Sequence, residues 1–232
     1  MIKNYDDFIR ALTSAGFSMA GGGSDEGVYG VPMPGWDGSQ TESPVRWFSG
    51  DPDTDPWEWR MRVLDERDDI AYGKLFFKKS GFITKEWYPF FLAARRGGKS
   101  FFDQYADGTV SHFAKRIYDV VAEHGTLPLE GIKRAAGFSK EDKSKFDAAL
   151  TELQMKFFLT TCGRQTKLSQ KGEISSWSST VFCTTETFWP PEIFDKAAGI
   201  SEKEAASAIA GQVLKLNPAA QEKKINKFIF GT

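Results

Sequence analysis

The sequence contains few of the residues that build metal and redox sites. It has two cysteines and two histidines among 232 residues. Cys162 and Cys183 form no Cys-x-x-Cys motif and have no histidine nearby, which excludes a zinc site. We expect both thiols to be reduced, as in a cytoplasmic protein, and we expect no metal ion or cofactor.

The chain also lacks a long apolar run and an excess of either charge. No stretch approaches the roughly 18 apolar residues of a membrane helix, so we expect no membrane partner. The first residues, MIKNYDDFIRAL, carry acids where a signal peptide has an apolar core, which favours a cytoplasmic location. Thirty Lys and Arg oppose thirty-one Asp and Glu, for a net charge of −1, so any attraction to nucleic acid must come from a local patch.

The segment Gly50 to Arg60 reads GDPDTDPWEWR, with aspartates at alternate positions as in calcium loops. An EF-hand loop that began at Asp51 would need glycine at its sixth position and glutamate at its twelfth. This chain has Pro56 and Arg62 at those positions. The segment is therefore not predicted to bind calcium.

The same residues suit the start of a helix. Asp55 is a favourable N-cap, Pro56 fits the first helical position, and Glu58 lies where a capping box has its acid. We predict a helix over about residues 56–69. Its core-facing stripe is predicted to be Trp57, Met61 and Leu64.

Residues 109–184 carry the most informative pattern. A long amphipathic helix is predicted over 109–124, a short helix over 127–137 and a third helix over about 143–156. Two β-prone segments follow, FFLTTCG and STVFCTTE, with a polar and basic loop between them. Long helix, short helix, turn, helix, strand, basic loop, strand is the order of a winged helix-turn-helix, whose third helix contacts DNA.

The predicted fold class is mainly α with small β-hairpins, that is, α+β. The predicted architecture is a winged helix-turn-helix. It would be a tandem arrangement if the N-terminal part holds a second, degenerate winged helix. We expect an N-terminal helical domain at 1–106, the winged helix at 107–185 and a C-terminal helical extension at 186–232.

Basic residues cluster where a winged helix touches nucleic acid, at the start of the third helix and along the loop between the strands. The predicted nucleic-acid-binding residues are Lys140, Lys143, Lys145, Lys156, Arg164, Gln165, Lys167 and Lys171. A secondary basic patch is predicted from Lys78, Lys79, Arg95, Arg96 and Lys99. The cations of this secondary patch could instead be solvated, or neutralised by the acidic helix around residues 65–69, without binding nucleic acid.

Three segments carry a resemblance to a known family. They are SGDPDTDPWEWRMRVLDERDDIAYGKLFFKKSGFITKEWYPFFLAARR, DGTVSHFAKRIYDVVAEHG and ALTELQMKFFLTTCG. Over roughly residues 45–190 the chain resembles bacterial proteins labelled AlkZ-related, a group named after AlkZ-type DNA glycosylases. The resemblance implies a winged-helix architecture and an association with nucleic acid. The parent enzymes use a Gln-x-Gln motif to position water, and this sequence has none, so no catalytic residue is carried over.

These patterns together predict a winged-helix protein that binds duplex DNA with weak sequence specificity and has no assigned catalytic residue. Two other functions stay open. One is a glycosylase-like hydrolase with an altered active site, in which Trp57, Trp59 and Asp55 are candidates by residue type. The other is a winged-helix module that binds a protein partner or forms a homodimer.

Overall fold

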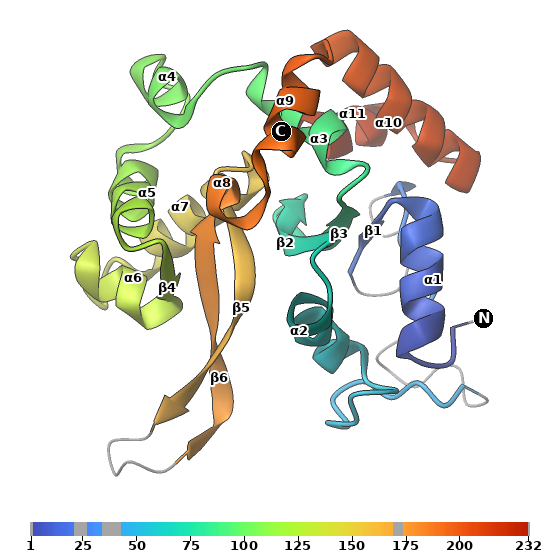
Figure 1. Ribbon diagram of the computed structural model, residues 1–232, viewed down its shortest axis with the longest axis horizontal. Helices are drawn as coiled ribbons and strands as arrows, with labels where there is room; N and C mark the ends of the chain where they lie inside the picture. The colour runs from blue at the N-terminus through green and yellow to red at the C-terminus, as the bar shows by residue number, and fades with distance from the viewer. Residues whose placement is uncertain (1, 21–26, 34–42, 169–173, 232) are drawn as a thin grey trace. The chain divides into compact units, whose positions relative to one another are not determined.

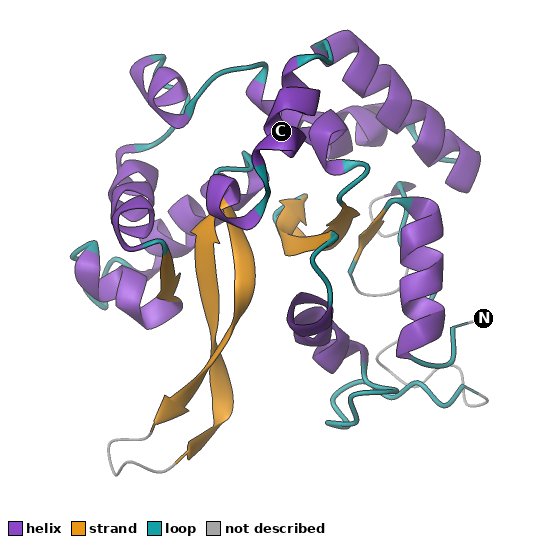
Figure 2. Cartoon of the chain, viewed as in Figure 1, coloured by secondary structure: helices purple, strands orange, loops and turns teal. Residues whose placement is uncertain are grey.

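The computed structural model describes residues 2–20, 27–33, 43–168 and 174–231, and in 166–168 and 174–177 it describes the backbone alone. The chain forms two compact units. Unit 1 is Met1–Gly98 with Glu192–Thr232, and unit 2 is Lys99–Pro191. Both units combine helices with antiparallel strands, so the α+β class is confirmed (Figure 2).

Unit 1 is built from both ends of the chain. Its elements are α1 (Tyr5–Ala15), β1 (Phe17–Met19), α2 (Pro56–Glu66), β2 (Ile70–Phe76), β3 (Lys79–Thr84), α3 (Tyr88–Arg96), α9 (Pro191–Ala198, which begins at the unit boundary), α10 (Glu202–Leu216) and α11 (Glu222–Phe230). The strands lie in the order β1-β3-β2, and β3 is antiparallel to both neighbours. Helix α3 contacts both α10 and α11, so C-terminal helices complete a unit that N-terminal residues begin (Figure 1).

Helix α2 begins as the sequence predicts but turns a different face to the core. Asp55 is its N-cap and accepts a hydrogen bond from the Trp57 amide. The buried tryptophan is Trp59, which is 1% exposed and stacks on Phe8 of α1 at 5.2 Å between ring centroids. The predicted stripe is therefore wrong for Trp57, which is only half-buried, because the rings of α1 select the other tryptophan.

Strands β2 and β3 form a hairpin that no sequence pattern predicts. The two residues between them, Phe77 and Lys78, have φ values of 50° and 61°. Two consecutive left-handed residues make the turn that matches the twist of a tight hairpin, and Asn-Gly is its usual sequence signal. Here a phenylalanine and a lysine occupy these positions, so the turn has no local signature.

Unit 2 carries the elements that the sequence predicts for 109–184. Its elements are α4 (Phe101–Ala106), α5 (His112–His124), β4 (Thr126–Pro128), α6 (Leu129–Ala135), α7 (Lys143–Met155), β5 (Leu159–Leu168), β6 (Ile174–Thr184) and α8 (Thr185–Phe188). Strand β6 pairs antiparallel with both β5 and β4. Strands β5 and β6 have 10 and 11 residues, longer than predicted, and Figure 1 shows them extending together away from α5, α6 and α7.

The core of unit 2 is an apolar cluster between the three helices and the strands. Ile117 of α5, Ile132 of α6 and Phe146 of α7 are fully buried within it, together with Phe158 and Leu159 at the start of the hairpin. This burial fixes α7 against α5 and leaves the turn between α6 and α7 at the surface. Within the described ranges, no helix is long and apolar enough to cross a membrane.

Candidate nucleic-acid interface

A basic cleft lies at the turn between α6 and α7. Its volume is about 540 Å³. Its lining residues are Glu130, Lys133, Arg134, Phe138, Ser139, Lys140, Lys143 and Phe146. Four of these side chains are cationic and one is acidic, so the cleft is locally positive in a chain whose net charge is −1.

The turn itself is held by a serine and an aspartate. The Ser139 amide and hydroxyl donate hydrogen bonds to the Asp142 carboxylate over 3.1 and 2.8 Å. These bonds, the hydroxyl first, lower the pKa of Asp142. Because this carboxylate faces Ser139, no side chain in the described part of the chain caps the first turn of α7. The amides at the start of this 13-residue helix are therefore free to meet an anion.

Three predicted binding residues, Lys140, Lys143 and Lys145, lie at this turn or in the first turn of α7. Lys140 is exposed, as is Arg134 across the cleft, and neither forms an ion pair among the described residues. Lys143 pairs with Asp147 at 2.6 Å and Lys145 pairs with Asp142 at 3.3 Å, both at the surface. Exposed pairs of this kind contribute about 0–1 kcal/mol, so a phosphate can replace the carboxylate at little cost.

Lys156 lies at the other end of α7, away from this turn. Its side chain is half-buried, and Nζ donates a hydrogen bond to Oε1 of the buried Gln104 over 3.1 Å. Burial lowers the pKa of Lys156. This hydrogen bond therefore links the end of α7 to α4.

The hairpin carries the remaining predicted residues. Arg164 and Gln165 are exposed on β5, paired in register with Thr180 and Ser179 of β6. Lys167 belongs to the same strand, although its side chain lies outside the described residues, as does all of Lys171. The structure brings Lys140, Lys143 and Lys145 together at one end of α7 and places Arg164 separately, on the hairpin.

The sequence reading missed two cations of the cleft, Lys133 and Arg134. Lys133 pairs with Glu130 at 3.1 Å and lies 5.3 Å from the centre of the Phe146 ring. Both residues stand in the last turn of the short helix, directly before the predicted helix-turn-helix turn. Their position could have identified them as binding residues, because residues on both sides of this turn line the same cleft.

The secondary basic patch does not form one surface. Lys78 and Lys79 are exposed at the turn of the β2–β3 hairpin. The Arg95 guanidinium instead donates hydrogen bonds to the carbonyls of Leu75, Phe228 and Ile229, each over 2.7 Å. Arg96 is 9% exposed, and its guanidinium lies 5.9 Å from the centre of the Phe194 ring.

Lys99, the last residue of the predicted patch, belongs to unit 2 and pairs with Asp107 at 2.7 Å. Burial lowers the pKa of Arg95 to about 9, so its guanidinium stays charged at neutral pH. Two of the five predicted residues, Arg95 and Arg96, thus act in the core of unit 1. The sequence around these arginines does not predict their burial, because the carbonyls of Phe228 and Ile229 and the Phe194 ring come from the C-terminal helices.

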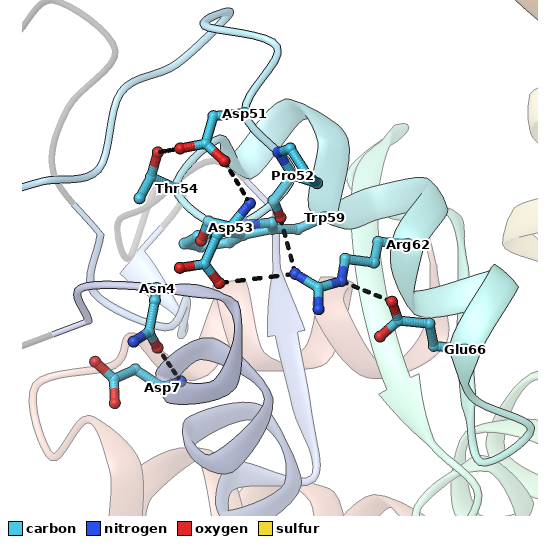
Figure 3. Close-up of polar contacts among 9 residues, drawn as sticks. All are labelled: Asn4, Asp7, Asp51, Pro52, Asp53, Thr54, Trp59, Arg62 and Glu66. Atoms are coloured by element: carbon cyan, nitrogen blue, oxygen red, sulfur yellow. Dashed lines mark hydrogen bonds and ion pairs between the residues drawn. The ribbon is translucent and has the colours of Figure 1, made fainter.

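The aspartates of the GDPDTDPWEWR segment form hydrogen bonds that hold the local backbone. Figure 3 shows two of them, Asp51 and Asp53. Asp51 accepts hydrogen bonds from the Asp53 amide at 2.9 Å and the Thr54 hydroxyl at 2.7 Å. The Asp53 carbonyl accepts from the Trp59 indole at 3.2 Å, and its carboxylate lies 3.8 Å from Arg62 (Figure 3). These groups are engaged with the protein itself, as the prediction of a helix start implies.

Asp55 is fully buried. Its Oδ1 accepts from the amides of Phe48 and Trp57 at 3.0 and 2.8 Å, and its Oδ2 accepts from the Gly50 amide at 2.9 Å. Three amides thus converge on one carboxylate. The arrangement holds Phe48 at φ 61°, a conformation that costs a non-glycine residue free energy.

An aromatic cavity of about 180 Å³ lies beside this loop in unit 1. Its lining residues are Phe8, Ala20, Met33, Trp47, Pro56, Trp57, Trp59, Arg60, Tyr72, Ser80 and Phe82. The Arg60 guanidinium stacks over the Trp57 ring at 3.3 Å from its centre. The cavity offers flat apolar walls and one cation, and the lining residues that the structure describes include no carboxylate and no side-chain amide.

The chain was compared with family models, curated proteins and solved structures. A family model described as AlkZ related matches residues 2–230. No curated protein and no solved structure matches the chain. The resemblance read from residues 45–190 is therefore confirmed, and it extends over both units.

Proposed function

The chain belongs to the AlkZ-related family, and from this premise we propose that it is a winged-helix protein that binds duplex DNA with little sequence specificity. The family takes its name from DNA glycosylases, which act on DNA. The observation that carries the proposal is the basic cleft between α6 and α7, which coincides with the uncapped start of α7. That helix end is where a recognition helix meets the DNA backbone.

The winged-helix assignment for residues 107–185 rests on topology. The order is α5, β4, α6, α7, β5, β6, and β6 lies between β4 and β5. A short strand after the first helix that pairs with the last strand is what closes a winged helix. In this assignment α7 is the recognition helix and the β5–β6 hairpin is the wing.

Unit 1 repeats part of this order, which supports a second and degenerate winged helix. Its elements run α1, β1, α2, β2, β3, and β3 lies between β1 and β2 as β6 lies between β4 and β5. In this comparison α2 takes the place of α7. A short second helix has no counterpart among the described residues between β1 and α2.

The proposed contacts are electrostatic. Lys140, Lys143 and Lys145 meet phosphates at the start of α7, joined by Lys133 and Arg134 from the other side of the cleft. Arg164, Gln165, Lys167 and Lys171 act along the wing. Contacts of this kind position a protein on DNA without reading its sequence, which is why we propose weak specificity.

The test is a paired charge reversal in the cleft, Arg134→Glu with Lys140→Glu. Both side chains are exposed, so folding is unaffected while two phosphate contacts become repulsive. We expect affinity for a duplex of mixed sequence to fall roughly 30- to 100-fold at 0.1 M salt, and the salt slope to decrease by about 1.8. Binding is measured by fluorescence anisotropy across a salt series.

The matched control is Lys203→Glu with Lys223→Glu, two exposed lysines of unit 1. It changes the net charge by the same amount, so it separates local contact from bulk charge. If the cleft variant binds duplex DNA as tightly as the control, the cleft is not the interface.

A base-excising enzyme is the second candidate, and the aromatic cavity is the observation that favours it. A flipped base needs an aromatic wall, which Trp57, Trp59 and Tyr72 would supply. Excision also needs a group that positions or activates water. Asp55, the candidate carboxylate, accepts hydrogen bonds from backbone amides with both oxygens, and the described lining residues include no carboxylate that could replace it.

We therefore expect duplex DNA binding without base release. The measurement is a single-turnover reaction with the protein in excess over alkylated duplex DNA, followed by chromatography of any free base. A known alkylation glycosylase is the positive control. Release of free base by the wild-type chain, and loss of that release in Trp57→Ala, would establish the enzyme instead.

A further inference from the structure

The hairpin brings together the only two cysteines of the chain. Cys183 of β6 lies opposite Thr160 of β5. Cys162 follows two residues later on β5, where the pairing shifts register between Thr161 and Gly163. A residue in such a bulge is unpaired, so its side chain can turn toward its neighbours across the strand.

The two thiols differ in environment. Cys162 is partly exposed, whereas Cys183 is buried at 1% exposure. A hydrogen bond from the Cys183 side chain lowers the pKa of Cys162. The same bond, with burial, raises the pKa of Cys183. Cys162 is thus the thiol that ionises more readily, and it is also the more exposed of the two.

We propose that Cys162 and Cys183 form an oxidation site at which peroxide converts the two thiols into an intramolecular disulfide. The Cys162 thiolate attacks one peroxide oxygen, the O–O bond breaks, and the products are a sulfenic acid and hydroxide, which takes up a proton. The Cys183 sulfur then attacks the Cys162 sulfur, an S–S bond forms, and water leaves. In sum, two thiols and one hydrogen peroxide give one disulfide and two waters.

The bond is expected to be reversible. Diagonal neighbours on antiparallel strands are about 7–8 Å apart between Cα atoms, whereas disulfides usually span about 4.4–6.8 Å. Closing the bond therefore draws β5 and β6 together at the bulge and strains it. Strained disulfides near solvent are readily reduced, which suits a regulated modification better than a structural cross-link. This inference concerns thiol chemistry and does not depend on DNA binding.

The experiment follows the thiols of the full chain. Reduced protein is treated with a small excess of hydrogen peroxide, labelled with N-ethylmaleimide and measured by intact mass spectrometry. We expect both labelling sites to be lost, a mass decrease of about 2 Da before labelling, and a peptide that joins Cys162 to Cys183. Dithiothreitol should restore two labels.

Two single variants assign the roles. In Cys183→Ser, dimedone should trap a sulfenic acid on Cys162, because no second thiol resolves it. In Cys162→Ser, Cys183 should react with neither peroxide nor dimedone on the same timescale. Circular dichroism confirms that each variant is folded. Retention of both thiols in the wild type, or a disulfide between two chains, would overturn the proposal.

Discussion

Replacing Arg95 with methionine is expected to lower the free energy of unfolding by roughly 3–5 kcal/mol. The guanidinium donates three hydrogen bonds of 2.7 Å, to Leu75 at the end of β2 and to Phe228 and Ile229 at the end of α11. Hydrogen bonds from a charged donor contribute about 1.5–3 kcal/mol each, and the loss is partly offset because a desolvated charge is removed with them. Methionine keeps the apolar stem but leaves three carbonyls without their donor.

Two further variants serve as references for the stability loss of Arg95→Met. Arg10 of α1 is 72% exposed, so Arg10→Met should change stability by about 0.5 kcal/mol or less. Arg95→Lys should fall in between, because one compact ammonium cannot reach three separated carbonyls as a planar guanidinium does. Urea unfolding followed by tryptophan fluorescence measures all three. An Arg95→Met midpoint equal to that of Arg10→Met would show that the bridge contributes nothing.

The second large effect is expected at Asp55. Asp55→Ala should cost roughly 2–4 kcal/mol, because a helix N-cap and two more amide partners are lost together in a buried position. Asp55→Asn should cost less. It keeps one acceptor oxygen, which can serve Phe48 and Trp57, but its amide group cannot accept from Gly50.

Asp53→Ala is the matched control, since it removes a carboxylate from the same loop. The Asp53 side chain is 61% exposed and lies 3.8 Å from Arg62, so the loss should be about 0–1 kcal/mol. Urea unfolding measures the series, and limited proteolysis reports whether the 48–50 loop opens in Asp55→Ala. Equal losses for Asp53→Ala and Asp55→Ala would refute the role assigned to the buried carboxylate.

Helix starts were the most predictable part of the fold, since their chemistry is local, whereas α2 ends at Glu66, three residues before its predicted end. Asp55 and Pro56 mark the start of α2, and Lys143–Met155 matches the third helix predicted for residues 143–156. Which face of a helix is buried depends on partners elsewhere in the chain. Trp57 and Trp59 are equally apolar, and the rings of Tyr5 and Phe8, far earlier in the sequence, select Trp59.

Strands were less predictable for two physical reasons. The outer part of β5 reads GRQTK before Leu168 and is polar on both faces, yet backbone pairing with β6 continues through it. Pairing of this kind needs no apolar side chains. The β2–β3 hairpin turns on Phe77 and Lys78, which lack the glycine or asparagine that usually marks a left-handed turn.

The candidate site was predictable in part, because charge is visible in a sequence while its surroundings are not. Lys140, Lys143 and Lys145 lie at the start of α7, as the helix boundary implies. Arg95 is equally basic, but its donors are satisfied by carbonyls up to 134 residues away. No pattern within a helix distinguishes a cation that faces solvent from one that binds a distant backbone.

The bridge from Arg95 to the end of α11 has a consequence for biosynthesis. Unit 2 is one continuous segment, so a nascent chain can complete it while the C-terminal helices are still in the ribosome. Unit 1 must wait for the carbonyls of Phe228 and Ile229, and for the Phe228 ring, which stacks on Phe76 at 4.0 Å. Until translation reaches them, the ring of Phe76 lacks the partner that covers it in the finished unit.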